Sequence, residues 1–370
     1  MQHNKSPLIS PVPGTQRCID SFHFGSKGQG KKIYIQSSLH ADELPGMLVV
    51  WKLKQALKEL ELQGDIQGEV VLVPVANPIG QNQHLMDVHL GRYEMENGHN
   101  FNRGYYDPFD DVVARLDGNL SEDSQHNGQL VKQALRESIA SISVATEYQS
   151  QQKALQLLCC DADIILDLHC DFEAITHTYS TYYSWPAIEP LARALQSSVN
   201  MLADDTGGNP FDSCFDMTWK RLREYFGFAL GESSCYSVTL ELKGQSDVYH
   251  EDAEHDAYAI LTYLSSLGVI KQPFDLPSST AQASDLDAVE PLKSTMGGLV
   301  VHYLTPGEHV RENQLISEII DPITDTIEEI RASQPGILFS RTNRRMATAG
   351  MLVAHVAGKK KVRSGYLLAP

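Results

Sequence analysis

Short apolar runs alternate with amphipathic helical patterns over the first 270 or so residues of this chain. The apolar runs have the length of strands and fall at 33–38, 70–75, 163–168 and 237–242, with 179–183 as a further candidate. Helical spacing follows the first run, with apolar side chains three or four residues apart at Met47, Val50, Leu53, Leu57 and Leu60. Further helices are expected over 129–160 (one long or two shorter), over 189–202, and over 252–267, which Gly268 closes. Strands that alternate with helices predict an α/β domain with a largely parallel or mixed sheet.

The pattern changes after residue 270. Residues 271–290 are rich in Ser, Ala, Asp and Pro and show no period, which indicates a linker or crossing segment. Residues 291–370 hold short β-like runs separated by turns such as Pro306-Gly307 and Pro335-Gly336. This pattern predicts a large domain over residues 1–270 followed by a small all-β module.

The charge balance narrows the classes of partner. Lys and Arg total 30 against 47 Asp and Glu, a net charge of -17, so nucleic acid and anionic membranes are not expected as partners. No stretch is long and apolar enough to span a bilayer, and the N-terminus lacks the apolar core of a secretory signal. Six scattered cysteines without a C-x-x-C pair favour reduced thiols over a disulfide framework. We therefore expect a cytoplasmic protein, and we leave open whether it forms a homo-oligomer.

A candidate metal site begins directly after the first apolar run. His40 and Glu43 are three residues apart at a strand-to-helix junction, where both side chains can point at one ion. His169 ends the apolar run 164–168 and is a plausible third ligand. Zinc takes imidazole nitrogen and carboxylate oxygen, and a catalytic zinc site has three protein ligands and one open position. His-x-x-Glu alone is more often part of a solvated surface turn, so the zinc hypothesis depends on the residues that accompany it.

A catalytic zinc site also needs a proton acceptor and a group that holds substrate charge. Glu241 ends the apolar run Val238-Thr239-Leu240. Burial beside a cation would bring its pKa into the range that suits a general base. The alternative is an edge-strand glutamate that faces water. Arg103 follows Asn102 in a polar segment without helix or strand period. Arginine binds carboxylates through two parallel hydrogen bonds, so Arg103 is either an anchor for an anionic substrate or a surface loop residue.

These residues occur in the order and approximate spacing of the succinylglutamate desuccinylase/aspartoacylase family, which belongs to the zinc carboxypeptidase-like hydrolases. The resemblance covers about residues 15–270 and rests on His40-x-x-Glu43, Asn77-Pro78, Arg92, Asn100-Phe101-Asn102-Arg103, Asp167-Leu168-His169 and Thr239-Leu240-Glu241. It implies a three-layer α/β/α catalytic domain with a mixed sheet.

The resemblance also implies a role for each matching residue. His40, Glu43 and His169 would bind one zinc ion (Zn2+) per chain. Glu241 would be the general base, Arg92 would polarise the scissile carbonyl, and the pair Asn102 and Arg103 would hold a substrate carboxylate. The expected partner is accordingly a small molecule that bears a carboxylate.

The C-terminal module is similar to a biotinyl/lipoyl-type barrel-sandwich domain, on the pattern Pro306-Gly307, Ile330-Arg331-Ala332 and Pro335-Gly336. In the carrier versions a lysine stands at a hairpin tip, and here the corresponding residue is Asp325. A carrier role is therefore rejected. The resemblance implies a structural module that packs on the active-site cleft or partly covers it.

Three functions compete at this stage. The leading hypothesis is a zinc-dependent amidohydrolase that removes an acyl group from a small N-acylated amino acid or related amine. The first alternative is a carboxypeptidase-like metallopeptidase on short or unusual peptides, since both families use Asn-Arg to hold a carboxylate. The second is a metal-free binding protein, although such a protein has no need of Glu241.

Overall fold

The chain builds one large mixed sheet. The computed structural model describes residues 1–365, 367 and 368. Its nine-stranded sheet has the order β1 (Gln2–Pro7), β2 (Cys18–Gly25), β4 (Glu69–Val73), β3 (Lys32–Ser37), β7 (Ile164–Asp171), β11 (Tyr236–Gly244), β9 (His177–Ser180), β10 (Val199–Leu202) and β12 (Ser284–Asp285). The four central strands from β4 to β11 are parallel, while β2 and β9 join them antiparallel. The predicted mixed α/β sheet is confirmed.

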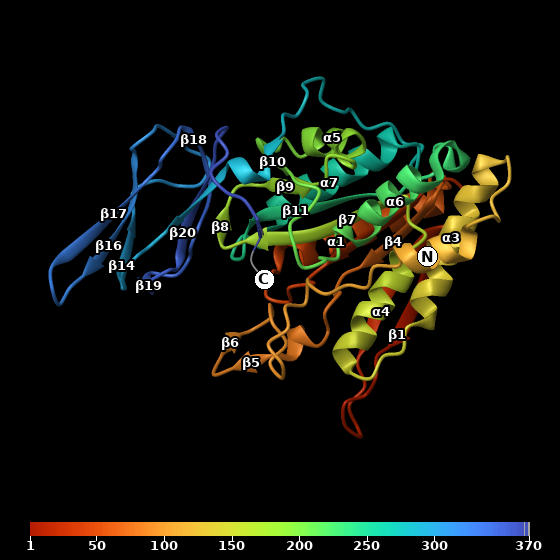
Figure 1. Ribbon diagram of the computed structural model, residues 1–370, viewed down its shortest axis with the longest axis horizontal. Helices are drawn as coiled ribbons and strands as arrows, with labels where there is room; N and C mark the ends of the chain where they lie inside the picture. Colours follow the sequence, from red (N-terminus) through yellow and green to blue (C-terminus); the bar gives the residue numbers. More distant parts are fainter. Residues whose placement is uncertain (366, 369–370) are drawn as a thin grey trace.

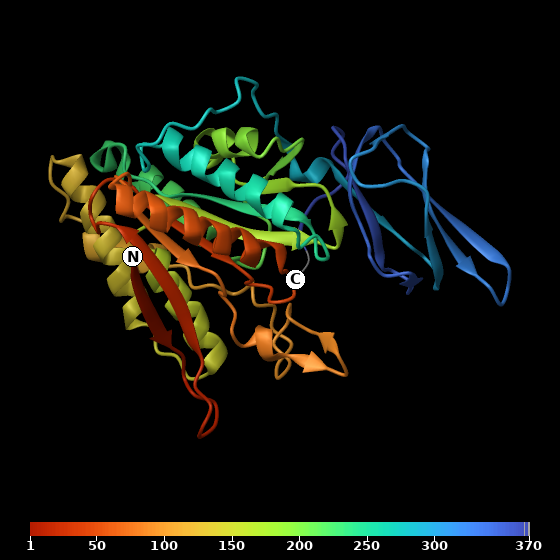
Figure 2. The ribbon, with the colours of Figure 1, turned by 180° about the vertical axis from the view of Figure 1, so that it is seen from behind.

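Alternate residues of the central strands point to two different helical layers. Ile33 and Ile35 pack in one apolar core with α1 (Pro45–Gln63), α5 (Trp185–Ala194) and α7 (His250–Ser266). Tyr34 packs on the other face in a core with α2 (Phe109–Leu116), α3 (Ser124–Ser141), α4 (Glu147–Cys159) and α6 (Ser213–Phe226). Because both faces are covered, the strands are apolar nearly throughout, and the three layers are visible in Figures 1 and 2.

Some elements differ from the sequence expectation. The segment 129–160 forms two helices, α3 and α4, which was one of the two alternatives. The expected helix over 189–202 is wrong in its second half, because α5 ends at Ala194 and residues 199–202 form β10. Gln196 has a left-handed φ of 54°, which stops the helix, and β10 is buried between β9 and β12. The helix α6 was not anticipated, although Phe215, Trp219 and Leu222 recur at helical spacing.

The C-terminal residues form an all-β module with its own apolar core. Its two sheets have the orders β13 (Val289–Lys293), β20 (Leu352–Ala357), β18 (Gly336–Arg341), β15 (His309–Val310) and β17 (Thr326–Arg331), β16 (Leu315–Asp321), β14 (Gly298–His302), β19 (Met346–Ala347). Asp325 lies in the turn between β16 and β17, where the sequence placed it. The expected linker 271–290 contributes β12 to the edge of the large sheet.

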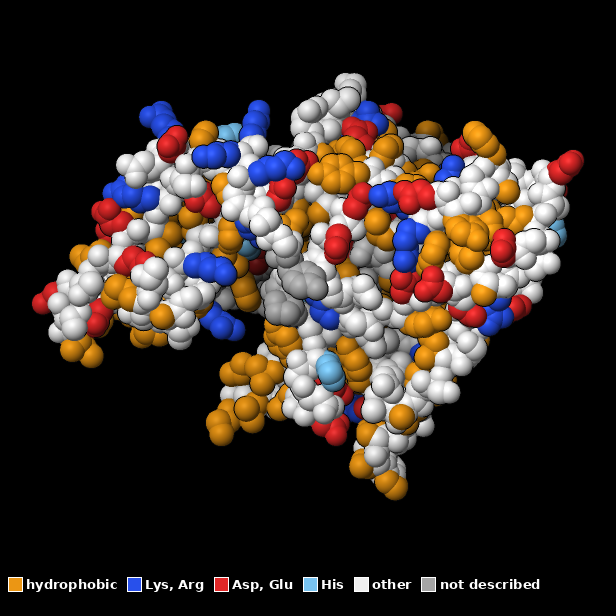
Figure 3. Space-filling model, viewed as in Figure 1, with side chains coloured by type: hydrophobic (Ala, Val, Ile, Leu, Met, Phe, Trp, Pro, Cys, Tyr) orange, Lys and Arg blue, Asp and Glu red, His pale blue; other side chains and the backbone are white. Residues whose placement is uncertain are grey.

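The module lies at one end of the molecule (Figure 1). The two-residue strand β8 (Glu173–Ala174) directly follows β7 and pairs with β18 of the module. An open notch separates the module from the protruding hairpin of β5 (His84–Leu85) and β6 (Val88–His89) (Figure 3). Within the described part of the chain, no helix is long and apolar enough to cross a membrane.

Candidate active site

Parallel strands bring the candidate ligands to one edge of the sheet. β3 pairs with β7, and β7 pairs with β11, so their carboxyl ends lie together. After β3, Ser38 adopts a left-handed φ of 62°, a strained conformation of the kind found at functional sites, and turns the chain into His40. α1 then begins close to the sheet, because a Cβ on Gly46 would lie only 3.0 Å from the Cβ atoms of Ser37 and Leu168.

His40, Glu43 and His169 form a buried cluster whose ligand atoms all lie within 4.8 Å of one another. Glu43 Oε1 is 2.9 Å from His40 Nδ1, and Glu43 Oε2 is 2.7 Å from His169 Nδ1. Two imidazoles and one carboxylate that converge on one point are a donor set that fits a catalytic zinc ion. The three predicted ligands thus meet, and their binding of zinc stays a prediction.

The far nitrogen of each imidazole faces an oxygen. His40 Nε2 lies 2.9 Å from Asn100 Oδ1, and His169 Nε2 lies 3.0 Å from Asp167 Oδ2. Asp167 is itself held by a hydrogen bond of 2.9 Å from the side chain of Gln36. Such outer contacts orient metal-binding histidines and select which ring nitrogen faces the ion. These supporting roles were not predicted.

Charge is distributed unevenly over the cluster. Burial acts to raise the pKa of Glu43, but His40 and His169 outweigh it and hold the pKa well below its usual range. Burial, aided by Arg92, lowers the pKa of His40. Burial also acts to lower the pKa of His169, yet Asp167 and Glu43 raise it well above its ordinary value. Glu43 is therefore anionic, as a metal ligand must be.

Arg92 reaches into the same cluster. Its Nη1 lies 3.2 Å from Glu43 Oε1 and 3.3 Å from His40 Nδ1. Burial acts to lower its pKa, and the nearby charge of Glu43, the largest of several opposing influences, raises it instead. Arg92 therefore places a permanent positive charge beside the candidate ligands.

Glu241 lies directly across from His169 in the β7–β11 ladder. Side chains of paired residues share one face, so the carboxyl points to the ligand side of the sheet. The register shifts immediately after Glu241, and bulges of this kind often re-aim a side chain beside an active site. Its Oε2 is buried and has no hydrogen-bond partner among the described residues. Burial, followed by the charge of Glu43, raises its pKa well above the ordinary value, as suits a group that must accept and return a proton.

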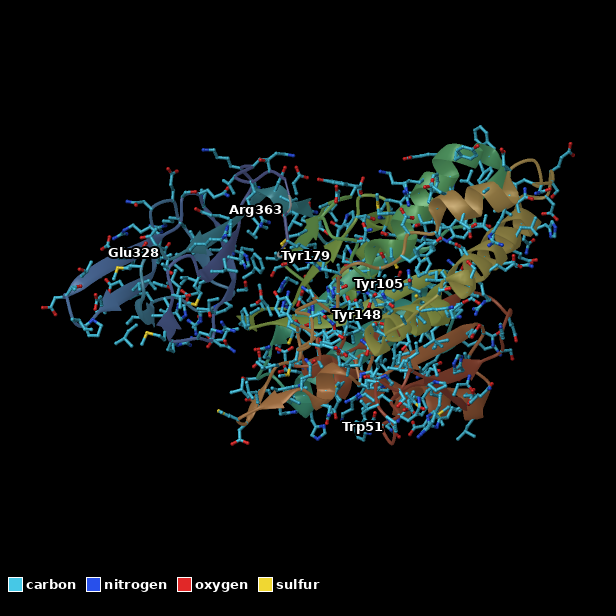
Figure 4. All side chains as sticks on the ribbon, turned by 60° about the horizontal axis from the view of Figure 1, so that its bottom comes forward. Trp51, Tyr105, Tyr148, Tyr179, Glu328 and Arg363 are labelled. Carbon is cyan, nitrogen blue, oxygen red and sulfur yellow. The ribbon has the colours of Figure 1, made fainter. Side chains whose placement is uncertain are left out.

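The Asn102-Arg103 segment is held from two sides. Phe211 N donates to Asn102 Oδ1 at 2.8 Å, and Arg103 Nη1 donates to the carbonyl of Asn102 at 2.7 Å. Tyr148 on α4 donates to the carbonyl of Arg103 at 3.1 Å (Figure 4). Burial lowers the pKa of Arg103, and Asp212 acts against that shift. Asp212, which accepts a hydrogen bond of 2.8 Å from Thr239, was not singled out in the sequence.

Comparison with known proteins assigns the family. Residues 29–267 match the succinylglutamate desuccinylase/aspartoacylase catalytic domain. The same fold occurs in family proteins from Shewanella amazonensis SB2B and Shewanella frigidimarina NCIMB 400, each 23% identical with a TM-score of 0.85, over 96% of this chain and 98% and 97% of theirs. It also occurs in the ectoine utilization protein EutE (DoeB) from Ruegeria pomeroyi, 16% identical with a TM-score of 0.70 over 97% of this chain and 95% of that one. No curated protein sequence matches the chain. Because the matched domain spans well over half of its length, the chain belongs to the succinylglutamate desuccinylase/aspartoacylase family.

Proposed function

We propose that this protein is a zinc-dependent hydrolase that cleaves the amide bond of a small N-acylated amino acid or related amine. The observation that carries the proposal is the carboxyl of Glu241, whose Oε2 is buried without a hydrogen-bond partner among the described residues, across the ladder from His169, one of three converging metal-type ligands. A metal-free binding protein would gain nothing from an unpartnered buried acid, since burial without a partner is costly.

Each residue of the candidate site has a separate role in the proposed reaction. A zinc ion held by His40, Glu43 and His169 would lower the pKa of bound water to about 7 and polarise the scissile carbonyl. Glu241 accepts the proton of the attacking water and returns it to the leaving nitrogen. Arg92, beside Glu43, faces the negative charge that develops on the carbonyl oxygen. Arg103 holds the carboxylate of the substrate through paired hydrogen bonds.

A hydrolysis screen tests the proposal. Purified protein would be stripped with a chelator, reloaded with Zn2+, and assayed on N-acetyl, N-succinyl and N-formyl amino acids and on short peptides. We expect zinc-restored hydrolysis of the acyl amino acids. Cleavage of peptides alone would favour the metallopeptidase alternative, and no zinc-dependent turnover of either class would contradict the proposed function.

Metal content tests the ligand set separately. His169→Ala should lose most of its zinc, because two ligands rarely hold the ion firmly. His126→Ala, at an exposed histidine on α3, is the matched control and should retain it. Full zinc occupancy of His169→Ala by atomic absorption would show that the ion binds elsewhere.

A further inference from the structure

The loop between β10 and α6 lies against the segment that carries Arg103. We call residues 203–212 the β10–α6 loop. The carbonyl of Gly208 in this loop accepts a hydrogen bond of 2.8 Å from Gly104 N. Asn102 Oδ1 accepts another, also of 2.8 Å, from the backbone of the loop. The loop therefore holds the residues on both sides of Arg103.

The side chain of Arg103 lies directly on the backbone of Gly208. A Cβ added to Gly208 would be 2.6 Å from Cδ, 3.1 Å from Nε and 3.6 Å from Cγ of Arg103. Carbon atoms in favourable contact are about 3.5–4.0 Å apart. Even a methyl group at position 208 would therefore overlap the aliphatic stem of the arginine, and glycine permits the approach because it has no Cβ.

Gly208 also has a left-handed φ of 77°, which strains any residue that has a Cβ. This strain lowers the stability of the fold, whereas the close contact determines the position of Arg103. Gly118 has almost the same φ, 74°, but a Cβ there would meet no atom within 4 Å. Alanine at each of the two positions therefore separates backbone strain from contact with the arginine.

The arginine side chain is the partner that can move. The carbonyl of Arg103 accepts hydrogen bonds from Tyr148 Oη at 3.1 Å and from Gln152 Nε2 at 2.8 Å, so its backbone is fixed to α4. Its stem can still rotate about single bonds. To lengthen the 2.6 Å contact to an ordinary one, the stem would have to shift by about 1 Å.

We propose that Gly208 is a positioning residue for Arg103: its bare backbone sets where the guanidinium lies and hence where a substrate carboxylate binds. This role rests on the proposed function, in which Arg103 holds that carboxylate. Two parallel hydrogen bonds to a carboxylate require a defined position of the guanidinium plane. A shift of about 1 Å in a group that orients the substrate can cost up to about 100-fold in rate.

Steady-state kinetics on the zinc-loaded full chain test the role, with a free-acid N-acyl amino acid and its amide as substrates. Gly208→Ala should lower kcat/KM for the free acid about 10-fold, mainly through KM, and leave the value for the amide unchanged, because the amide lacks the carboxylate. Gly118→Ala should lose stability to urea but retain the wild-type preference for the free acid. If Gly208→Ala lowered both values equally, or neither, the positioning role would be wrong.

A double variant shows whether Gly208 acts through Arg103. If it does, adding Gly208→Ala to Arg103→Lys should lower kcat/KM less than about 2-fold further, because the two-bond contact is already lost. Two independent effects would multiply instead, and a full further loss of about 10-fold would contradict the positioning role.

Crystal structures of the wild type and of Gly208→Ala give a readout that needs no turnover. The guanidinium of Arg103 should lie about 1 Å or more from its wild-type position, with the backbone of residues 102–105 unchanged. A wild type without zinc-dependent hydrolysis would contradict the proposed function, and this displacement would still decide the role of Gly208. The opposite result is an unmoved Arg103 with a loop that retreats into the adjoining cavity, which Gly207, Asn209 and Pro210 line, and it would overturn the proposal.

Discussion

At the scale of single residues, the negative charge of Glu43 influences the pKa values of its neighbours in the candidate site. Its two oxygens face two different histidines, and Arg92 approaches one of those oxygens. One carboxylate thus connects the loop that carries His40, the strand β7 and the segment that carries Arg92. The Oε2 atom of Glu241, one strand away, has no hydrogen-bond partner among the described residues, and the pKa of Glu241 rises because of burial and the charge of Glu43. The same anion that would bind the metal therefore helps to tune the candidate base.

Glu241→Gln should retain zinc and the fold yet turn over substrate about 10²–10⁴ times more slowly, because an amide cannot accept the proton. The matched control is Glu251→Gln, at an exposed position in the first turn of α7. Steady-state kinetics on zinc-loaded protein measure the effect. Near-normal turnover of Glu241→Gln would place the base elsewhere.

Arg103→Lys should lower kcat/KM about 10- to 100-fold and leave zinc in place, because lysine cannot reproduce a planar, two-bond contact with a carboxylate. Substrates whose carboxylate is masked as an amide should react poorly with the wild type. Arg115→Lys on α2 is the control and should behave like the wild type. Equal hydrolysis of free-acid and amidated substrates would argue against the carboxylate anchor.

That His40, Glu43 and His169 meet in one cluster was predictable, because metal chemistry permits few residue types. A histidine, a cysteine or an acidic residue at the end of a buried strand can complete a His-x-x-Glu pair, and His169 stands at such a position. Asn100 and Asp167 were recognised only as parts of a motif. Their supporting roles depend on how loops and strands meet in space, and the spacing of residues in the sequence does not predict such contacts.

At the scale of elements, strands buried on both faces were the most predictable, because they are apolar throughout. β1 was not anticipated: its sequence is polar, most of it is exposed, and it pairs with β2 at the sheet edge. The expected helix over 189–202 failed because a four-residue buried strand and a helical turn have the same apolar composition.

The module is attached beside both ligand-bearing segments. β8 continues β7 past His169, and Glu173 on β8 lies 2.6 Å from Arg341 and 2.6 Å from Arg345 of the module. On the other side, Asp42, which lies between His40 and Glu43 in the sequence, accepts from Gln245 at 3.0 Å, and Gln245 accepts from Asn343 at 3.2 Å. The expected structural role of the module thus has named contacts to support it.

Glu173→Gln should therefore lower the free energy of unfolding by about 1 kcal/mol at neutral pH, a modest value because the pair is partly exposed and screened. Burial acts to raise the pKa of Glu173, but Arg345 and Arg341 lower it, so this stability is present above the ordinary glutamate pKa and is lost as the pH falls through the lowered one. Urea unfolding at low and high salt measures it, with Glu329→Gln, at an exposed pair with Arg331, as the control. If Glu173→Gln did not change the free energy of unfolding at low salt, β-pairing alone would hold the module.

At the scale of the whole molecule, a row of ring contacts, the first edge-on and the second stacked, joins the module to the large sheet. His177 of β9 lies 4.8 Å from Phe339 of β18, and Phe339 lies 5.4 Å from His355 of β20. Ser340 Oγ lies 2.9 Å from His355 Nδ1. Burial lowers the pKa of His355 to about 4, with Arg363 and His177 acting the same way and Asp171 acting against them. The module should accordingly be held most firmly when His355 is neutral.

The sign of the pH dependence follows from that shift. The unfolded chain binds a proton at His355 near pH 6.5, whereas the folded chain does so only near pH 4, so folding becomes less favourable as the pH falls through this window. Between pH 7.5 and 5 the wild type should lose about 2 kcal/mol of stability that His355→Gln does not lose. Urea unfolding followed by circular dichroism at both pH values measures this difference, and His309→Gln, at an exposed histidine of the same module, should follow the wild type. If His355→Gln lost as much stability as the wild type on acidification, the junction between module and sheet would not be sensitive to the charge of this residue.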